Sequence, residues 1–344
     1  MIILEREEAR PMTAKNMQVL LNSRPSGWVQ EGDFRIVETE IPAPGDGQVL
    51  VRSLFLSLDP YMRGRMNDAK SYATPVPIGG VMEGETVSEV VQSNNARFKA
   101  GDIVVCRTGW QQYAVSDGTG MRKVDPKAVP LTTYLGVVGM PGVTAWIDLL
   151  DIGQPKEGET VVVAAATGAV GGVVGQIAKL KGCRAVGIAG GKAKCDYAVK
   201  ELGFDACVDY RDGHLYDALA AATPKGIDVY FENVGGEILD TVLRRLNANA
   251  RIPLCGLISQ YNATDPYGVK NLASLLVNRV KLEGFIVSDR MQRWPVALPE
   301  LAGWVASGKI KYRETITEGL EKAPKAFIGL LKGENFGKQL VKTA

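Results

Sequence analysis

Histidine is almost missing from this chain of 344 residues, because His214 is the only one. The sequence also has no Cys-x-x-Cys pair. Zinc sites draw their protein ligands mainly from these two residue types, so a site built from several histidines is excluded and no metal is expected. A Ser-His-Asp relay would have to use His214, whose surroundings, RDGHLYD, indicate an exposed helix start. We therefore expect His214 to be a surface residue.

An excess of charge and long apolar runs are also lacking. The net charge is +2, which gives no reason to expect a nucleic-acid partner or a membrane surface. No apolar stretch approaches the ~20 residues that a membrane span needs. The first residues, MIILEREEARP, are too short and too acidic for a signal peptide. The five scattered cysteines are typical of reduced thiols, so we expect a cytoplasmic protein.

Two patterns divide the chain into domains. Residues 1–130 are rich in strand-like segments such as DFRIVETEIP and GDIVVC, which predict a β-rich domain. In residues 131–311, apolar strands such as TVVVAAAT and RAVGIA alternate with helical segments, including one at residues 269–279. This alternation predicts a parallel, doubly wound sheet with helices on both faces. We expect the tail, residues 312–344, to return to the first domain.

A glycine-rich turn follows the first strand of the predicted parallel sheet. In VVVAAATGAVGGVVGQ the spacing is Ala165-x-x-Gly168-x-x-Gly171, a variant of the G-x-G-x-x-G pattern. Gly168 would let the backbone approach a pyrophosphate, and Gly171 would let the next helix pack on the strand. The helix N-terminus would then present free N–H groups to the anion. The alternative is a glycine-rich packing turn, but the strand–turn–helix context favours dinucleotide binding.

The second strand ends where a site for NAD normally carries an acidic residue. Gly190 follows Gly168 by 22 positions (190 minus 168), close to the offset of about 20 residues for the ribose-binding acid. Glycines stand here instead, with Lys192 and Lys194 next along the chain and Tyr210 ending the third strand. Space, positive charge and a hydroxyl favour the 2′-phosphate of NADPH. Taken alone, the lysines could equally be solvated helix residues.

Seven motifs, in this order along nearly the whole chain, resemble a known family: DPYMRGRM, GMPGVTAW, AATGAVGGVVGQIAKLKGCRAVGIAGG, FENVGGE, CGLISQYN, EGFIVSD and ENFGKQLVK. The family is the zinc-independent branch of the medium-chain dehydrogenase/reductase superfamily. Within it, the sequence is most similar to the prostaglandin, 2-alkenal and bacterial curcumin reductases. The resemblance implies an α/β fold with a GroES-like β-rich domain and a Rossmann domain, a cleft between them and a homodimer. It also implies hydride transfer from NADPH to the β-carbon of α,β-unsaturated ketones and aldehydes.

The resemblance also carries cofactor contacts over to individual positions. Those that would hold the phosphates of NADPH are Gly168, Ala169, Val170, Gly171, Lys194 and Tyr210. Those that would lie along the rest of the cofactor are Asn233, the loop from Cys255 to Tyr261 with Gly256 and Ser259, then Phe285, Ile286, Val287 and Asn335.

The mechanism needs a hydrogen-bond donor that stabilises the negative charge developing on the substrate carbonyl oxygen. Tyr261 resembles the family tyrosine that contacts this carbonyl, and a protonated phenol is a suitable donor. Tyr61, in DPYMR, is the alternative donor from the β-rich domain, although its ring could simply pack the turn. Tyr72 and Tyr267 are further candidates for lining the pocket, which the sequence does not place.

Two other functions remain open from the sequence. A quinone oxidoreductase of the same superfamily would share the fold and cofactor, although DPYMR and CGLISQYN argue against it. A non-catalytic NADPH-binding redox sensor would keep the glycine turn and need no intact cleft, whereas Tyr261 and Asn335 favour a working site.

Overall fold

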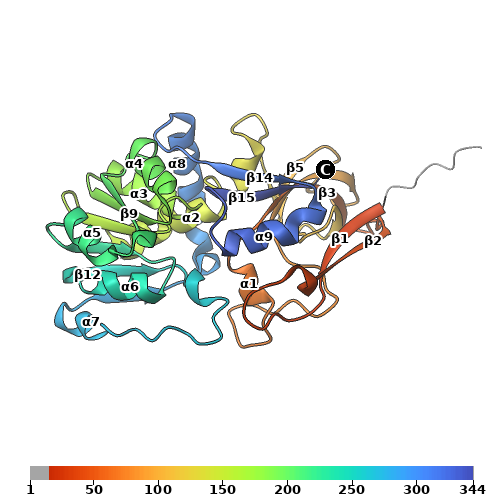
Figure 1. Ribbon diagram of the computed structural model, residues 1–344. Coiled ribbons are helices and arrows are strands. Elements are labelled where there is room, and N and C mark those ends of the chain that lie inside the picture. The colour runs from red at the N-terminus through yellow and green to blue at the C-terminus, as the bar shows by residue number, and fades with distance from the viewer. Residues whose placement is uncertain (1–14, 344) are drawn as a thin grey trace, which may run out of the picture.

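The computed structural model describes residues 15–343, which form two lobes lying side by side (Figure 1). One lobe is a six-stranded sheet flanked by helices, and the other is built from a seven-stranded sheet and a two-stranded ribbon. No helix within residues 15–343 has the length and apolar character needed to cross a membrane. The predicted α/β fold class, a β-rich domain plus a Rossmann domain, is confirmed.

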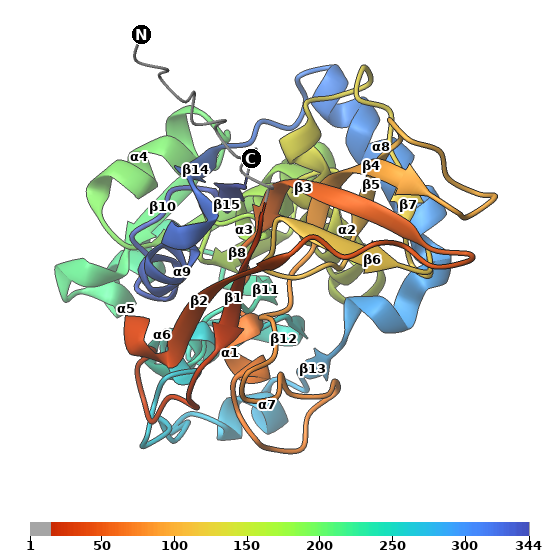
Figure 2. The same cartoon turned by 90° about the vertical axis from the view of Figure 1, so that its right-hand side faces the viewer.

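The β-rich lobe has its seven-stranded sheet in the order β14-β15-β3-β4-β5-β7, with β6 paired to β3. The ribbon β1-β2 crosses the front of this lobe in Figure 2. The strands are β1 (Lys15–Leu21), β2 (Phe34–Glu40), β3 (Val49–Ser57), β4 (Thr86–Ser93), β5 (Ile103–Cys106), β6 (Tyr113–Ser116), β7 (Arg122–Lys123), β14 (Glu314–Glu318) and β15 (Lys338–Lys342), and the helices are α1 (Met62–Arg65) and α9 (Ala323–Leu331). Because β15 pairs with β3, the last strand of the chain lies in the sheet of the β-rich lobe. The domain boundaries at residues 130 and 311 stay predictions.

The Rossmann lobe has its strands in the order β10-β9-β8-β11-β12-β13, all of them parallel. This is the strand order 3-2-1-4-5-6 of a doubly wound dinucleotide-binding sheet. The strands are β8 (Thr160–Ala164), β9 (Arg184–Ala189), β10 (Ala206–Asp209), β11 (Ile227–Phe231), β12 (Leu246–Leu254) and β13 (Lys281–Gly284). The helices are α2 (Met140–Ile147), α3 (Gly171–Leu180), α4 (Lys192–Lys200), α5 (Leu215–Ala222), α6 (Gly236–Leu243), α7 (Ala273–Val277) and α8 (Trp294–Ala306).

The central strand β8 shows why its sequence, TVVVA, has no polar alternation. All five residues are buried because helices cover both faces of the sheet. Val161 and Val163 belong to the core formed with α2, α3 and α8, whereas Val162 and Ala164 belong to the core formed with α5 and α6. The two cores fix β8 between them, and its carboxyl end therefore has a defined position in the lobe.

Two local expectations had different outcomes. His214 is exposed at the N-cap of α5, as expected. The helix expected over residues 269–279 is wrong in length, because the structure forms only α7 there, and none of the residues of α7 is buried. A helix without a buried face gains little from tertiary packing, which is the usual source of helix stability.

We expect the fit of α3 against the chain that enters β10 to be sensitive to one added methyl group. A Cβ on Gly175 would lie 1.8 Å from Cζ of Phe204, so Gly175→Ala should lower the free energy of unfolding by about 1–3 kcal/mol through overpacking. The control is Gly303→Ala in α8, where no atom lies within 4 Å of the added Cβ, and which should raise the free energy of unfolding by about 0.5–1 kcal/mol. Urea unfolding of both variants measures the effects, and an unchanged midpoint for Gly175→Ala would contradict the packing.

Candidate functional site

A cleft of about 770 Å³ runs between the two lobes, along the carboxyl ends of the Rossmann strands. This volume lies within the range of small-molecule and cofactor sites, about 300–1,000 Å³. It is lined by these residues predicted above as catalytic or cofactor contacts: Tyr61, Gly168, Ala169, Val170, Gly171, Gly190, Lys194, Tyr210, Asn233, Cys255, Gly256, Ser259, Tyr261, Phe285, Ile286, Val287 and Asn335. The fold thus brings these residues to one place.

The turn between β8 and α3 forms the floor of the cleft. Ala165 has φ 53°, the left-handed conformation that the first glycine of the G-x-G-x-x-G pattern would adopt easily. A Cβ on Gly171 would lie 2.3 Å from the carbonyl oxygen of Ala165, so no larger residue fits there. The N–H groups of Val170 and Gly171 have no hydrogen-bond acceptor among residues 15–343. Together with the ten-residue helix α3 behind them, they suit an anion.

The second turn, after β9, gathers two cations and a hydroxyl. A Cβ on Gly190 would lie 2.9 Å from both the Tyr210 hydroxyl and Nε of Arg211, so the glycine makes room for these side chains. Lys194 Nζ donates a hydrogen bond to the Gly333 carbonyl (2.7 Å). Burial, and then the nearby Arg211 guanidinium, lowers the pKa of Lys194. Like charges held close together are unfavourable unless an anion joins them, which fits a phosphate.

The structure separates the two lysines that the sequence left open. Lys194 lines the cleft, whereas Lys192 lies outside it, exposed, and pairs with Asp196 at 2.6 Å. Arg211 is a cleft cation that sequence reasoning missed. Its signal was its place directly after Tyr210, at the end of the third parallel strand.

The Rossmann wall of the cleft is held by hydrogen bonds between successive strand ends. The Asn233 amide donates to the Ala164 carbonyl (2.8 Å) and ties the end of β11 to the end of β8. Ser259 Oγ donates to the Val234 carbonyl (2.6 Å), which fixes the loop that follows β12. The hydroxyl oxygen of Tyr261 accepts a hydrogen bond from the Leu257 N–H (3.3 Å). Burial raises the pKa of Tyr261, so its hydroxyl stays protonated at neutral pH and can donate.

Cys255, in the loop that follows β12, lines the cleft with a thiol that stays protonated. Burial raises its pKa well above the usual value, with Asp148 as the next cause, and only a thiolate is a strong nucleophile. Phe285, Ile286 and Val287 lie directly after β13 rather than within it.

The opposite wall comes from the β-rich lobe. Tyr61 is at the N-cap of α1, and burial, followed by the Asp59 carboxylate, raises its pKa far above its usual range. The Arg65 guanidinium lies 4.3 Å from the ring centre of Tyr72 and 5.3 Å from that of Tyr61. Arg65 also forms an ion pair with Glu83. This charged and aromatic wall was missed from the sequence, apart from its tyrosines.

Of the two tyrosines left unplaced by the sequence, only one reaches the cleft. Tyr72 lines it, whereas the Tyr267 hydroxyl donates to Asp240 (3.1 Å) outside it. The tail completes the lining: the Asn335 amide donates to the Gly337 carbonyl (2.7 Å), and Gly337 forms an isolated parallel bridge with Gly168.

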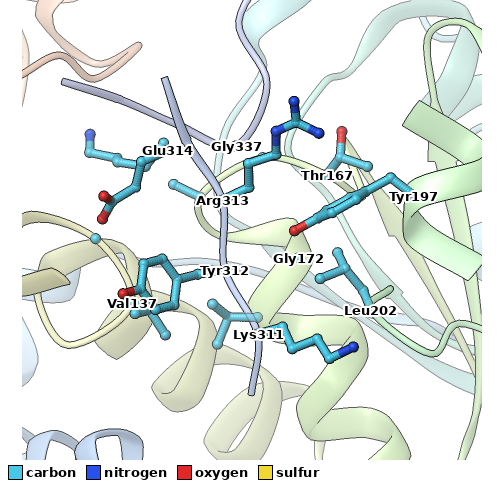
Figure 3. Close-up of a pocket in the computed structure, with 15 residues that line it drawn as sticks. Val137, Thr167, Gly172, Tyr197, Leu202, Lys311, Tyr312, Arg313, Glu314 and Gly337 are labelled. Carbon is cyan, nitrogen blue, oxygen red and sulfur yellow. The ribbon is translucent and has the colours of Figure 1, made fainter. Parts of the chain in front are cut away.

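A second, much smaller space lies behind the turn between β8 and α3 (Figure 3). It measures about 20 Å³ and is lined by residues such as Thr167, Tyr197 and Arg313. A space of this size holds about one water molecule, so the main cleft is the candidate functional site. Within residues 15–343, no group of three or more His, Cys, Asp or Glu side chains is placed to hold a metal ion.

Comparison with known proteins agrees with this arrangement. Residues 17–124 match a family described as the N-terminal domain of oxidoreductase, and residues 169–303 match one described as zinc-binding dehydrogenase. The chain is 53% identical to NADPH-dependent curcumin reductase from Escherichia coli (strain K12), over 96% of this chain and 97% of that protein. It is 47% identical to prostaglandin reductase 1 from Rattus norvegicus, over 92% and 95% of the two chains.

A solved structure shows the same likeness. The crystal structure of CurA in complex with NADPH from Vibrio vulnificus superposes with a TM-score of 0.92 and is 53% identical, covering 95% of this chain and 99% of that one. Sequence identity at this level, over nearly the full length of each relative, shows that the chain and these relatives belong to one family. The chain belongs to the medium-chain dehydrogenase/reductase superfamily, in the branch that includes the curcumin and prostaglandin reductases.

Proposed function

We propose that this protein is an NADPH-dependent reductase of the C=C bond of α,β-unsaturated ketones and aldehydes, including curcumin-type enones. The observation that carries the proposal is that one cleft joins a phosphate turn, a cationic pocket and two protonated tyrosines. The names of the relatives, a curcumin reductase and a prostaglandin reductase, support the same chemistry. The physiological enone stays open, because loops from both lobes shape the substrate end of the cleft.

The chain offers a suitable contact for each part of NADPH. The N–H groups at the start of α3 would bind the pyrophosphate. Lys194, Tyr210 and Arg211 would bind the 2′-phosphate. Phe285 to Val287 would hold the nicotinamide end, and Asn335 would contact the cofactor from the tail. When bound, the dihydronicotinamide would supply a hydride to the β-carbon of the enone.

Tyr261 is the proposed donor to the substrate carbonyl. Its oxygen already accepts the Leu257 N–H, so the hydroxyl proton is free to point at another acceptor. Hydride addition places negative charge on the carbonyl oxygen, and a neutral donor fixed beside it stabilises the resulting enolate. Tyr61 is the second candidate donor, from the opposite wall. The α-carbon then takes up one proton, which completes the reduction.

We also propose that the protein acts in the cytoplasm as a homodimer. The five cysteines are free thiols, which suits a reducing compartment. Strand β13 is at the edge of the Rossmann sheet, and next to it α7 exposes Leu276 (82%) and Val277 (68%). An edge strand beside exposed apolar side chains can pair with the same edge of a second copy.

The dimer proposal predicts a solution mass of twice 37.0 kDa by light scattering. Leu276→Glu should shift the protein toward the monomer, because burying an unpaired charge in the interface is costly. The control is Leu180→Glu, at an exposed position of α3, away from the edge strand β13. A monomeric wild type would contradict the proposal.

For the 2′-phosphate pocket, we predict that Lys194→Ala weakens NADPH binding by about 10- to 100-fold, the loss expected for one charge-assisted hydrogen bond. NADH binding should change little, because NADH has no 2′-phosphate. Lys192→Ala is the matched control and should leave both affinities unchanged, since Lys192 lies outside the cleft. Fluorescence titration of the two cofactors measures all four constants. An equal loss for NADPH and NADH would refute the role of Lys194.

For the reaction, we predict that a medium-chain enone and curcumin cause loss of dihydronicotinamide absorbance, faster with NADPH than with NADH. Tyr261→Phe should lower kcat by about 10²- to 10³-fold, as removal of one oxyanion donor does, with NADPH affinity retained. Tyr267→Phe is the control outside the cleft. Turnover of quinones but of no enone would favour the quinone oxidoreductase, and NADPH binding without either activity would favour the redox sensor.

A further inference from the structure

Lys338 forms a buried ion pair with Asp59 that joins two segments of the β-rich lobe beside the cleft. Its Nζ donates to Oδ1 of Asp59 (2.6 Å) and to the Leu58 carbonyl (2.8 Å). The side chains of Lys338 and Asp59 are 4% and 8% exposed. Both residues also line the cleft. Lys338 begins strand β15, whereas Asp59 lies just after β3, so the pair connects distant parts of the chain.

On one side, the ion pair leads to Tyr61. The second carboxylate oxygen of Asp59 accepts a hydrogen bond from Ser57 Oγ. The Asp59 carbonyl accepts the Met62 N–H (3.1 Å) and so closes the turn that begins α1. Tyr61 sits within this turn, at the N-cap of α1. The position of Asp59 therefore determines where the Tyr61 ring enters the cleft.

On the other side, the backbone before Lys338 is fixed to the phosphate turn. Gly337 bridges to Gly168, and its carbonyl accepts the Asn335 amide. Gly337 has φ 74°, and a Cβ there would lie 1.9 Å from the Arg313 carbonyl, so the chain is tightly confined. The Lys338 N–H donates to this same carbonyl (2.9 Å). Short backbone contacts thus hold Gly168, Gly337 and Lys338 close to one another.

We propose that Lys338 is a positioning residue that couples the phosphate turn to Tyr61 through Asp59, so that cofactor binding sets the substrate wall of the cleft. The proposal rests on the proposed function and deepens it. A buried ion pair is a weak source of stability, because removing both charges from water offsets their attraction. Its defined geometry instead gives it a role in placing the groups that it joins.

Hydrogen exchange measured by mass spectrometry tests the coupling without any turnover. In the wild type, NADPH should slow exchange in residues 168–175 and also in residues 59–66. In Lys338→Met, which keeps the length of the side chain and removes its charge, NADPH should still slow exchange in residues 168–175. The slowing in residues 59–66 should fall by about 5-fold or more, the size of a typical coupling between sites. Lys342→Met, on the same strand and exposed, is the matched control.

Kinetics separate positioning from simple structural support. Lys338→Met should lower kcat for the enone by about 10- to 100-fold through misplacement of Tyr61, while NADPH affinity stays within about 2-fold. Adding Tyr61→Phe to this variant should lower kcat little further, because both substitutions remove the contribution of the Tyr61 hydroxyl. Asp59→Asn is the second variant if Lys338→Met does not fold.

The outcomes distinguish the inference from the proposed function. Unchanged protection of residues 59–66 in Lys338→Met, or full additivity with Tyr61→Phe, would overturn the coupling. If the wild type shows the coupled protection but reduces no enone, the coupling stands and the proposed function fails. If NADPH protects neither segment in the wild type, both fail.

Discussion

The close approach of the chain to itself at the turn between β8 and α3 is the constraint on which the rest of the site depends. Ala165 takes a left-handed conformation, and its carbonyl oxygen sits where a side chain on Gly171 would have to be. This arrangement starts α3 at the edge of the sheet and leaves its first N–H groups directed toward the cleft. It also places Gly168 beside Gly337 of the tail, so the turn proposed to bind an anion is also a contact with the β-rich lobe.

The two lobes divide the chemistry between them. The Rossmann lobe supplies the residues proposed to bind the phosphates, and Tyr261, all near strand ends on one edge of a parallel sheet, where such sheets bind ligands. The β-rich lobe supplies Tyr61, Tyr72 and the charged residues around Arg65. The tail of the chain belongs to the β-rich sheet through β15, yet its Asn335 and Gly333 line the cleft. The cleft is therefore built by segments from both ends of the sequence.

The sequence predicted the parts of this site that have a local pattern. Glycine spacing, strand ends and the lack of an acid at Gly190 are local, and they pointed to two turns that both line the cleft. The choice between Lys192 and Lys194 was not local, because it depends on where residue 333 lies relative to α4. Arg65 and Lys338 were missed because their positions in the cleft come from long-range packing, whereas Arg211 had a local signal in its place after Tyr210. Likewise, only the tertiary structure shows that Tyr72 enters the cleft whereas Tyr267 turns to Asp240.

The central claim is hydride delivery to a carbon–carbon double bond within this cleft. The most direct measurement is reduction of an enone with NADPH that carries deuterium on the transferred position of its nicotinamide, with the product analysed by NMR. Our account predicts a saturated ketone with one deuterium on the β-carbon and none on the carbonyl carbon. Deuterium on the carbonyl carbon of an unsaturated alcohol, or a product without deuterium, would contradict it.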